Sequence, residues 1–441
     1  MGGRVSRRHP EALFFKLLRV PGLMRTPVGR RQLRWSLMSR LWPVSRRAAR
    51  MYRRTICRKP RLVAVVGSFG KTTTARAVAV ALGLSAEGIR GLNAGNSLAL
   101  RLLGVRPSDR WGVLEVGIGK AGQMHTYAEM IRPDMTVVTS IGSEHHTSLR
   151  TLETTRQEKA EMLRVLPSGG LAVLNGDDPN VRWMRGTTTA SALTFGFDAS
   201  SDVRATDLHF DGAMGMRFTL RIEGTPHEMS TRLVGRHMLY PILAAVAVAV
   251  AEQRPLDEVL PALEALDPTP RRLERLRARN GATLLVDTIK SHLETIEAAI
   301  ESFAGIRPIT GRRIVVLGEV EEPPGSLGSV YRALGRHLAG GASLVVFVGG
   351  KRALRPLRSG LREGGFPLGA VVHTGRSPRA AAQCLADSLN PEDLVLIKGR
   401  STEHLERVAY ALAGREVTCD LAFCSVKWSC GDCPMLARRT P

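Results

Sequence analysis

Short runs of apolar, often β-branched residues recur along the chain, and a segment with helix-forming composition follows most of them. Leu62–Val66 is the clearest, because glycines follow it and an alanine- and leucine-rich stretch then extends to Leu82. Apolar runs of this length are typical of strands buried on both faces of a parallel sheet. Their alternation with helices indicates an α/β layered fold. The same pattern predicts strands at 111–116, 135–139 and 171–174.

A second series of such runs begins after Asp267-Pro268-Thr269-Pro270, a segment typical of a linker because prolines restrict the residues before them. It predicts another α/β domain, with strands at 282–287, 313–317, 344–348, 370–373 and 394–397. A chain of 441 residues is too long for one core. We therefore expect four parts: a basic arm (1–60), a first α/β domain (61–267), a second α/β domain (268–413) and a cysteine-rich tail (414–441).

The loop after the first predicted strand has the composition of a phosphate-binding site. Glycines let backbone N–H groups approach an anion, a helix N-terminus attracts it, a lysine reaches the terminal phosphates, and the next threonine can hold Mg²⁺. The strict G-x-x-x-x-G-K-[ST] pattern is not met, because Val65 stands at its first glycine. The shorter G-x-x-G-K-T-T form still lies between a strand and a helix, which favours a nucleotide site over a simple turn. Its residues are Gly67, Ser68, Phe69, Gly70, Lys71, Thr72 and Thr73.

Three more polar residues follow this loop in an order that suggests a site. Glu115 lies at the end of the second predicted strand, and His145 comes shortly after the third. Lys159 lies 14 residues beyond His145, in a predicted helix that begins near Leu152. Open α/β sheets bind their ligands at the carboxyl ends of the strands, which is where the first two residues are expected.

With these residues in this order, the chain resembles the Mur ligases, the ATP-dependent amide-forming enzymes of peptidoglycan assembly. It is most similar to the branch that adds D-Ala-D-Ala. The resemblance implies that Glu115 and His145 hold Mg²⁺ and that Lys159, as a carbamate, supports the metal site. A carbamate replaces a cation by oxygen ligands, which Mg²⁺ prefers. The matching segments are GSFGKTT, GLNAGNS with Asn93 and Asn96, LEVGIGKAG, RPDMTVVTSIGSEH and LNGDDP.

The second α/β domain resembles the Rossmann-like C-terminal domain of the same family. By that resemblance, Arg272 contacts the terminal phosphates of ATP and Asp287 holds the ribose side. Leu317–Glu319 and Lys398–Ser401 match the region that binds the incoming amine, although Lys398 also fits a plain strand-end lysine. The family's asparagines are missing from Gly235–Pro241, which leaves the adenine contacts open, and the drift around Asp287 suggests a different acceptor.

The positive charge of the chain is concentrated at its beginning. The chain carries a net charge of +23, of which residues 1–60 contribute +16. Arginines alternate there with Leu, Phe, Met and Trp, and Pro21, Pro27 and Pro43 divide the arm into short helical pieces. One interpretation is an interfacial helix on an anionic membrane. The others are an arm that folds onto its own body or binds RNA without specificity. The pattern is not that of a signal peptide.

Four of the six cysteines lie in the tail with the spacing C-x4-C-x5-C-x2-C. Their thiolates could bind Zn²⁺ or an iron–sulfur cluster, and free thiols are the alternative. We expect a structural role for this group. Its members are Cys419, Cys424, Cys430 and Cys433.

These features predict an ATP-dependent ligase that converts a carboxylate to an acyl phosphate, releases ADP and joins the acid to an amine, such as an amino acid or peptide. Lys71, Arg272 and the Lys159 carbamate would serve the phosphoryl transfer. A Mur-like nucleotide-binding scaffold without ligase activity is the alternative. The resemblance covers about 61–413 and excludes the part of the family that recognises a UDP-linked donor. We expect a cytoplasmic protein, peripheral at the inner membrane face if the arm binds lipid.

Overall fold

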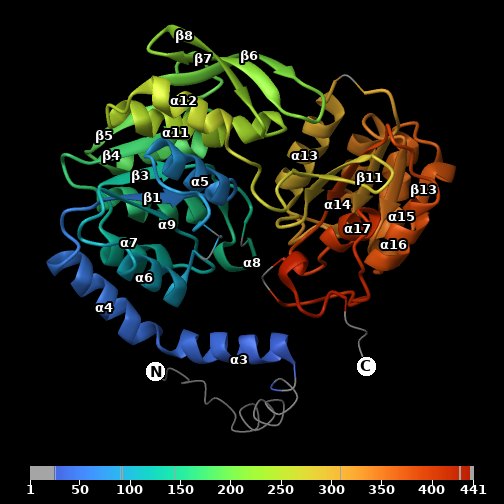
Figure 1. Ribbon diagram of the computed structural model, residues 1–441, viewed down its shortest axis with the longest axis horizontal. Helices are drawn as coiled ribbons and strands as arrows, with labels where there is room; N and C mark the ends of the chain where they lie inside the picture. Colours follow the sequence, from blue (N-terminus) through green and yellow to red (C-terminus); the bar gives the residue numbers. More distant parts are fainter. Residues whose placement is uncertain are drawn as a thin grey trace, which may run out of the picture.

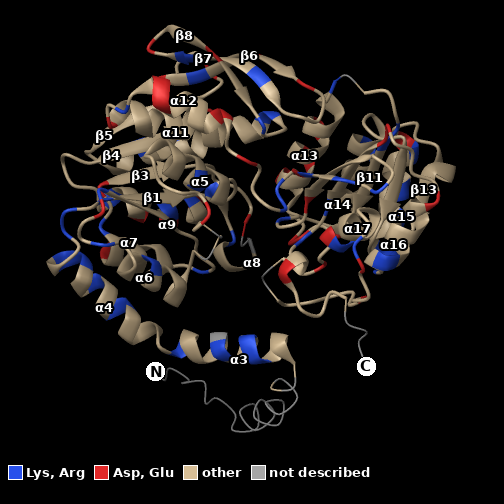
Figure 2. Cartoon of the chain, in the orientation of Figure 1, with Lys and Arg blue, Asp and Glu red and all other residues tan. Residues whose placement is uncertain are grey.

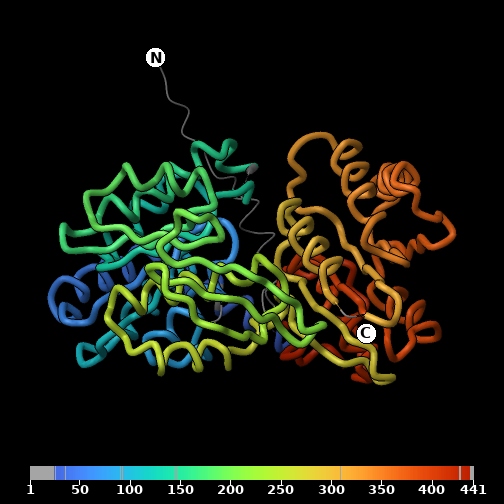
Figure 3. The backbone as a smooth tube through the Cα atoms, turned by 90° about the horizontal axis from the view of Figure 1, so that it is seen from above, coloured from blue at the N-terminus to red at the C-terminus, as the bar shows by residue number. Residues whose placement is uncertain are grey.

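The computed structural model describes residues 24, 26–89, 91, 93–144, 146–307, 309–426 and 429–437, apart from the side chains of Trp35 and His146. Two α/β bodies lie side by side, and each contains one sheet (Figures 1 and 3). The predicted metal ligand His145 lies outside the described residues. The α/β fold with parallel strands is confirmed.

The first sheet has eight strands in the order β2-β1-β3-β4-β5-β6-β7-β8. The strands from β2 to β6 pair in parallel, whereas β7 and β8 are antiparallel. Every strand predicted for this part of the chain is present, and the polar residues that follow β1, β2 and β3 therefore meet at one edge. The four are β1 (Arg61–Val66), β2 (Trp111–Glu115), β3 (Met135–Val138) and β4 (Leu171–Asn175).

Helices cover both faces of this sheet. On one face, α5 (Lys71–Ala81) packs against α11 (Leu239–Ala251), whose residues are nearly all apolar and buried. On the other face lie α6 (Gly95–Leu103), α7 (Gln123–Ile131) and α9 (Leu152–Arg164). Shorter helices and turns complete the body: α8 (His146–Leu149), α10 (Pro179–Met184), α12 (Leu256–Glu264), η1 (Arg185–Thr187) and η2 (Arg236–Met238).

Four strands at the far edge of this sheet were not among those predicted. Exposed or half-buried positions interrupt their buried residues, and some of these positions carry charge, such as Arg217 and Arg221 in MRFTLRI. A search for uninterrupted apolar runs misses such strands, because only one of their faces is buried. They are β5 (Ser191–Gly196), β6 (Val203–Phe210), β7 (Met216–Ile222) and β8 (Thr225–Thr231).

The second sheet has the order β13-β12-β11-β14-β10-β9, and only β9 (Glu274–Arg277) is antiparallel to its neighbour. The five predicted strands are β10 (Thr283–Asp287), β11 (Arg313–Leu317), β12 (Leu344–Phe347), β13 (Val371–His373) and β14 (Leu394–Lys398). The helices are α13 (Leu293–Gly305), α14 (Leu327–Ala339), α15 (Lys351–Glu363), α16 (Pro378–Ala386) and α17 (Glu406–Leu412), with η3 at Leu368–Ala370.

Two basic helices precede the first sheet (Figure 2). α3 (Pro27–Arg40) is largely exposed, whereas α4 (Trp42–Thr55) packs against α6 and α7. The buried guanidinium of Arg53 donates to Asp134 at 2.8 Å and to several backbone carbonyls around it. The second half of the basic arm thus folds onto the body. No helix in the described part of the chain is long and apolar enough to cross a membrane.

The tail follows α17 and lies against the second body (Figure 1). The buried guanidinium of Arg407 donates to the backbone oxygens of Cys419 and Leu421. The backbone N–H of Cys424 donates to Thr402 O at 2.8 Å, and Gln32 of α3 donates to Ser425 at 3.4 Å. A short turn, η4 (Cys430–Asp432), ends the described tail beside α17.

Candidate active site between the two bodies

The predicted phosphate loop connects β1 to α5. Gly67 has φ 143°, and a Cβ at this position would lie 1.9 Å from Thr139 Oγ1. Gly70 has φ 82° and directly precedes Lys71, the first residue of α5. Other residues rarely adopt these conformations, and the first position also has no room for a side chain. Both glycines are therefore required by the loop itself.

Two residues of this loop are held by the segment after β3. The backbone N–H groups of Ser68 and Phe69 donate to Ser140, the first to its carbonyl oxygen at 2.7 Å and the second to its hydroxyl at 3.2 Å. The Phe69 ring meets His292 of the second body edge to face, with centroids 5.6 Å apart. Ser68 and Phe69 thus fix the loop and join the two bodies.

A buried carboxylate, Glu144, lies at the centre of the site and gathers three lysines. Lys71 Nζ is 3.1 Å and Lys159 Nζ 3.9 Å from Glu144 Oε2, and Lys290 of the second body is 2.6 Å from Oε1. Lys71 also donates to the carbonyls of Gly67 and Ser68. Three amines around one carboxylate favour the binding of anions. In the sequence, Glu144 is marked only by its position directly before His145.

Lys159 is among the most deeply buried lysines, with 2% of its surface exposed. Its Nζ donates to Ser68 Oγ at 2.8 Å, so α9 brings it to the phosphate loop. Burial lowers the pKa of Lys159 well below its usual range, and Lys71 lowers it further, whereas Glu144 opposes the shift. The amine therefore has a strong tendency to be neutral.

Thr72 and Glu115 provide oxygens suited to Mg²⁺. Glu115 Oε1 accepts from Asn93 Nδ2 at 2.7 Å, whereas its Oε2 is buried and has no hydrogen-bond partner among the described residues. A Cβ on Gly91 would lie 3.5 Å from Thr72 Oγ1 and 4.0 Å from Glu115 Oε2, so both oxygens face the same small space. Oxygen ligands of this kind fit Mg²⁺.

Arg272 enters this site from the segment between the bodies. Its Nη2 donates to Thr72 Oγ1 at 2.8 Å, and burial lowers its pKa. The neighbours Arg271 and Leu273 have φ 60° and 48°, values that cost free energy for residues other than glycine. Thr269 of the predicted linker bonds to Thr73 at 3.0 Å. The two bodies thus meet at the phosphate loop.

Family models match both bodies. The Mur ligase middle domain matches residues 65–249, and the glutamate ligase domain of Mur ligases matches residues 271–401. The chain belongs to the Mur ligase family.

Relatives of known activity agree with this assignment. The UDP-N-acetylmuramoyl-tripeptide–D-alanyl-D-alanine ligase of Mycobacterium tuberculosis is 28% identical over 376 residues, which cover 81% of this chain and 74% of the relative. The UDP-N-acetylmuramate–L-alanine ligase of Halorhodospira halophila is 30% identical over 76% of this chain and 70% of its own. In fold, the chain is similar to the MurF ligase of Thermotoga maritima in complex with ADP, with a TM-score of 0.72, 21% identity and 84% and 83% of the two chains covered.

The resemblance seen in the sequence is therefore confirmed, and the chain is an ATP-dependent ligase that forms amide bonds. ATP and Mg²⁺ are the cofactors of Mur ligases, and a carboxylate and an amine are their substrates. These findings favour the ligase over the alternative of a nucleotide-binding scaffold without activity.

Asp287 and Lys398, two further residues singled out in this Mur ligase, lie side by side. Lys398 Nζ is 2.9 Å from Asp287 Oδ2, and both lie at the carboxyl ends of adjacent strands, β14 and β10. In the segment that lacks the family's asparagines, His237 bonds to Ser302 at 3.1 Å, and burial lowers its pKa to about 4. His237 therefore links the two bodies as a neutral side chain.

A cavity of about 330 Å³ lies beside the strand ends of the second sheet. Glu319 accepts from Arg376 at 2.8 Å and from Arg400 at 3.2 Å, so the two segments that matched the amine-binding region meet here. Burial raises the pKa of Glu403, which also lines the cavity, to about 7. Ala422 and Phe423 of the tail complete the lining.

The structure brings Cys424 and Cys430 to the same histidine, His404, and places Cys419 against another residue. Cys430 lies within 4.8 Å of ligand atoms of His404 and Glu406, a group that the sequence did not suggest. Interaction with His404 lowers the pKa of Cys424. Cys419 instead lies 3.4 Å from a guanidinium nitrogen of Arg407. None of the four forms a disulfide bond in the described part of the chain.

Proposed function

We propose that a substrate carboxylate attacks the γ-phosphorus of ATP between the two bodies. An oxygen–phosphorus bond forms as the bond to the β,γ-bridging oxygen breaks, and ADP leaves. An amine then attacks the acyl carbon, phosphate leaves, and the amine gives up a proton as the amide forms. Catalysis of this kind depends on positioning and on charge stabilisation.

The meeting of Arg272 with the phosphate loop carries this proposal. A phosphoryl group in transfer spreads negative charge over its oxygens. Lys71, from the first body, and Arg272, from the second, reach the same loop, with the Arg272 guanidinium 2.8 Å from Thr72 Oγ1. Both cations are thus available where that charge develops. We assign the nucleotide to the loop residues Gly67–Thr73, with Asp287 on the ribose side.

We assign Mg²⁺ to Thr72, Glu115, His145 and the carbamate of Lys159. The buried Glu115 Oε2, unpartnered among the described residues, supports this assignment. When bound, Mg²⁺ would offset phosphate charge and bridge its oxygens. Lys159 suits carbamylation, because CO₂ reacts with a neutral amine and burial beside Lys71 favours that form.

We assign the amine substrate to the cavity lined by Glu319, Arg376 and Arg400. Arg376 and Arg400 supply guanidinium groups at this cavity, which fit the free carboxylate of an amino acid or peptide. Glu319 offers a partner for the ammonium group.

Trapping with hydroxylamine tests the mechanism. Purified protein with ATP, Mg²⁺ and a panel of carboxylic acids should form an acyl hydroxamate together with ADP, because hydroxylamine captures an acyl phosphate. Arg272→Ala should form both products about 10²-fold more slowly. Release of ADP with a productive acid but without hydroxamate, under conditions that trap acetyl phosphate, would contradict the acyl phosphate.

We also propose that the basic arm binds an anionic membrane through α3, which would make this a peripheral enzyme at the cytoplasmic face. The exposure of Leu37, Met38 and Leu41 among arginines supports this idea. Because α4 packs on the body, the variant to test lacks residues 1–40. It should lose salt-sensitive binding to vesicles with phosphatidylglycerol and keep its melting temperature. Unchanged vesicle binding would refute the proposal.

A further inference from the structure

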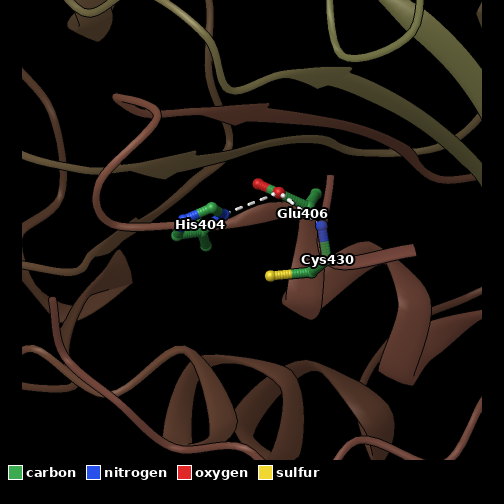
Figure 4. A group of neighbouring side chains, drawn as sticks. All are labelled: His404, Glu406 and Cys430. Atoms are coloured by element: carbon green, nitrogen blue, oxygen red, sulfur yellow. Dashed lines mark hydrogen bonds and ion pairs between the residues drawn. The ribbon is translucent and has the colours of Figure 1, made fainter. Parts of the chain in front are cut away.

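A cluster of soft and borderline metal ligands lies in the second body, where Thr288, directly after β10, and Arg271 both contact Glu406. Figure 4 shows the side chains of His404, Glu406 and Cys430 directed toward one another. Their ligand atoms lie within 4.8 Å of one another, and all three residues are buried. Thiolate and imidazole are the groups that bind zinc in structural sites.

The histidine of this cluster is oriented for a ligand. Its Nδ1 bonds to Glu406 Oε1 at 3.0 Å, while Nε2 is buried and has no hydrogen-bond partner among the described residues. Only 1% of His404 is exposed, so no solvent compensates Nε2. Histidines that bind metal commonly use their second nitrogen to bond a carboxylate in this way. An unpaired buried nitrogen is costly without such a ligand.

The carboxylate in turn is held from three other sides. Glu406 accepts from Thr288 Oγ1 at 2.9 Å, from Arg271 at 3.2 Å and from the backbone N–H of Cys430 at 3.3 Å. These contacts leave Glu406 to position the His404 ring. They also bring Cys430 beside that ring.

We propose that His404, Cys424, Cys430 and Cys433 bind one zinc ion, with Glu406 positioning His404. Cys430 and Cys433 have the C-x2-C spacing with which one turn supplies two ligands. Cys419 is left out, because its sulfur lies against Arg407. One imidazole and three thiolates complete a tetrahedral set.

The ion would fix one wall of the cavity assigned above to the amine, a consequence that rests on the proposed function. Phe423 lines that cavity and directly precedes Cys424. Zinc binding itself requires no catalysis, so the two proposals can fail separately.

Metal analysis of the full chain, expressed with zinc and purified without oxygen, is the first test. We expect about one zinc per chain in the parent protein and in the controls Cys419→Ser and Cys384→Ser. His404→Gln, Cys424→Ser and Cys430→Ser should lose it, and Glu406→Gln should bind zinc about 10–100-fold more weakly. If Cys419→Ser lost its zinc while His404→Gln retained it, the proposed ligand set would be wrong. Four titrating thiols without metal, or iron with visible absorption, would overturn the zinc site.

Two measurements on the unmodified sequence cover the case in which a variant fails to fold. Cobalt(II) in place of zinc should show the d–d bands of a tetrahedral site. The charge-transfer absorption should have the intensity expected for three thiolate ligands, and an intensity expected for four would contradict the proposed ligand set. Removal of zinc by a chelator should increase amide hydrogen exchange in residues 419–433 and leave 67–74 unchanged. Equal exchange with and without zinc would contradict a site that holds the tail.

Discussion

Two buried glutamates organise polar clusters in this ligase, and they differ in the charge around them. Glu144 has three lysine amines within 4 Å, whereas Glu406 is matched by one arginine, one histidine and two neutral donors. Amines from both bodies surround Glu144, whereas charged and neutral donors of the second body and the tail share Glu406. A group of amines suits a site that takes up phosphate, whereas a buried, mutually bonded group suits a site that holds the chain together.

The largest expected difference is in stability. Glu406→Gln should lower the free energy of unfolding by about 3–5 kcal/mol, because it breaks a buried ion pair. Glu144→Gln should also destabilise the free protein, but ADP with Mg²⁺ should restore much of that loss, since phosphate oxygens can replace the carboxylate. Denaturant titrations with and without ADP measure both effects. If ADP stabilises the two variants equally, the distinction between the clusters is wrong.

Lys71→Ala tests the functional cluster directly. Removal of its ammonium should reduce ADP formation about 10²–10³-fold, the range found for single groups that stabilise a transition state. The melting temperature should change little, because Glu144 keeps the ammonium of Lys290 as a partner at 2.6 Å. Lys351→Ala, at an exposed position of α15, is the matched control. Normal turnover by Lys71→Ala would remove the phosphate loop from the mechanism.

Two adjacent arginines allow the site at the phosphate loop and the cluster around Glu406 to be tested separately. Arg272 bonds to Thr72 in the phosphate loop, and Arg271 bonds to Glu406. Arg272→Ala should lower ADP formation about 10²-fold with little loss of stability. Arg271→Ala should do the reverse, with a lower unfolding midpoint and near-normal turnover. The comparison would break if the two variants showed the same pair of effects in turnover and unfolding assays.

Lys159→Ala should give the smallest of these effects on rate. Loss of a group that supports the metal ligands is expected to reduce activity about 10–100-fold. Short-chain carboxylic acids should recover part of it by occupying the space of the carbamate. Lys120→Ala, at an exposed lysine, controls for the acids themselves. Near-normal activity of Lys159→Ala without added acid would show that the carbamate is not needed.

The phosphate loop could be predicted well from the sequence, because the residues that define it follow one another along the chain. Strand, glycines, lysine and helix follow one another within Leu62–Leu82, and nine predicted strands are present. Glu144 and Lys290 were not foreseen as partners, since they meet only where the two bodies touch. The pairing of Lys398 with Asp287 likewise depends on the adjacency of β14 and β10.

The metal ligands of the tail were harder to predict, because the spacing of cysteines does not show which of their side chains point toward one another in the folded chain. His404 precedes the first tail cysteine by 15 residues and lies in the turn before α17, so no local motif includes it. Cys419 has suitable spacing, but its sulfur meets the Arg407 guanidinium. The proposed ligands come from the turn that holds His404 and from the tail that folds back onto it. Such a set is recognised only in the folded chain.

The junction at Leu41 has a mechanical consequence for the enzyme. This residue ends α3 and caps α4 without an intervening loop, and Arg53 then anchors α4 to the body. A membrane surface that bound α3 would therefore fix the orientation of the whole molecule relative to that surface. A flexible linker in place of this rigid connection would let the molecule rotate freely. The same face of the active site would meet the surface in every encounter. A substrate anchored in the membrane would then have a high effective concentration at the active site. This would hold only if its reactive group reached the face of the enzyme that is turned toward the membrane.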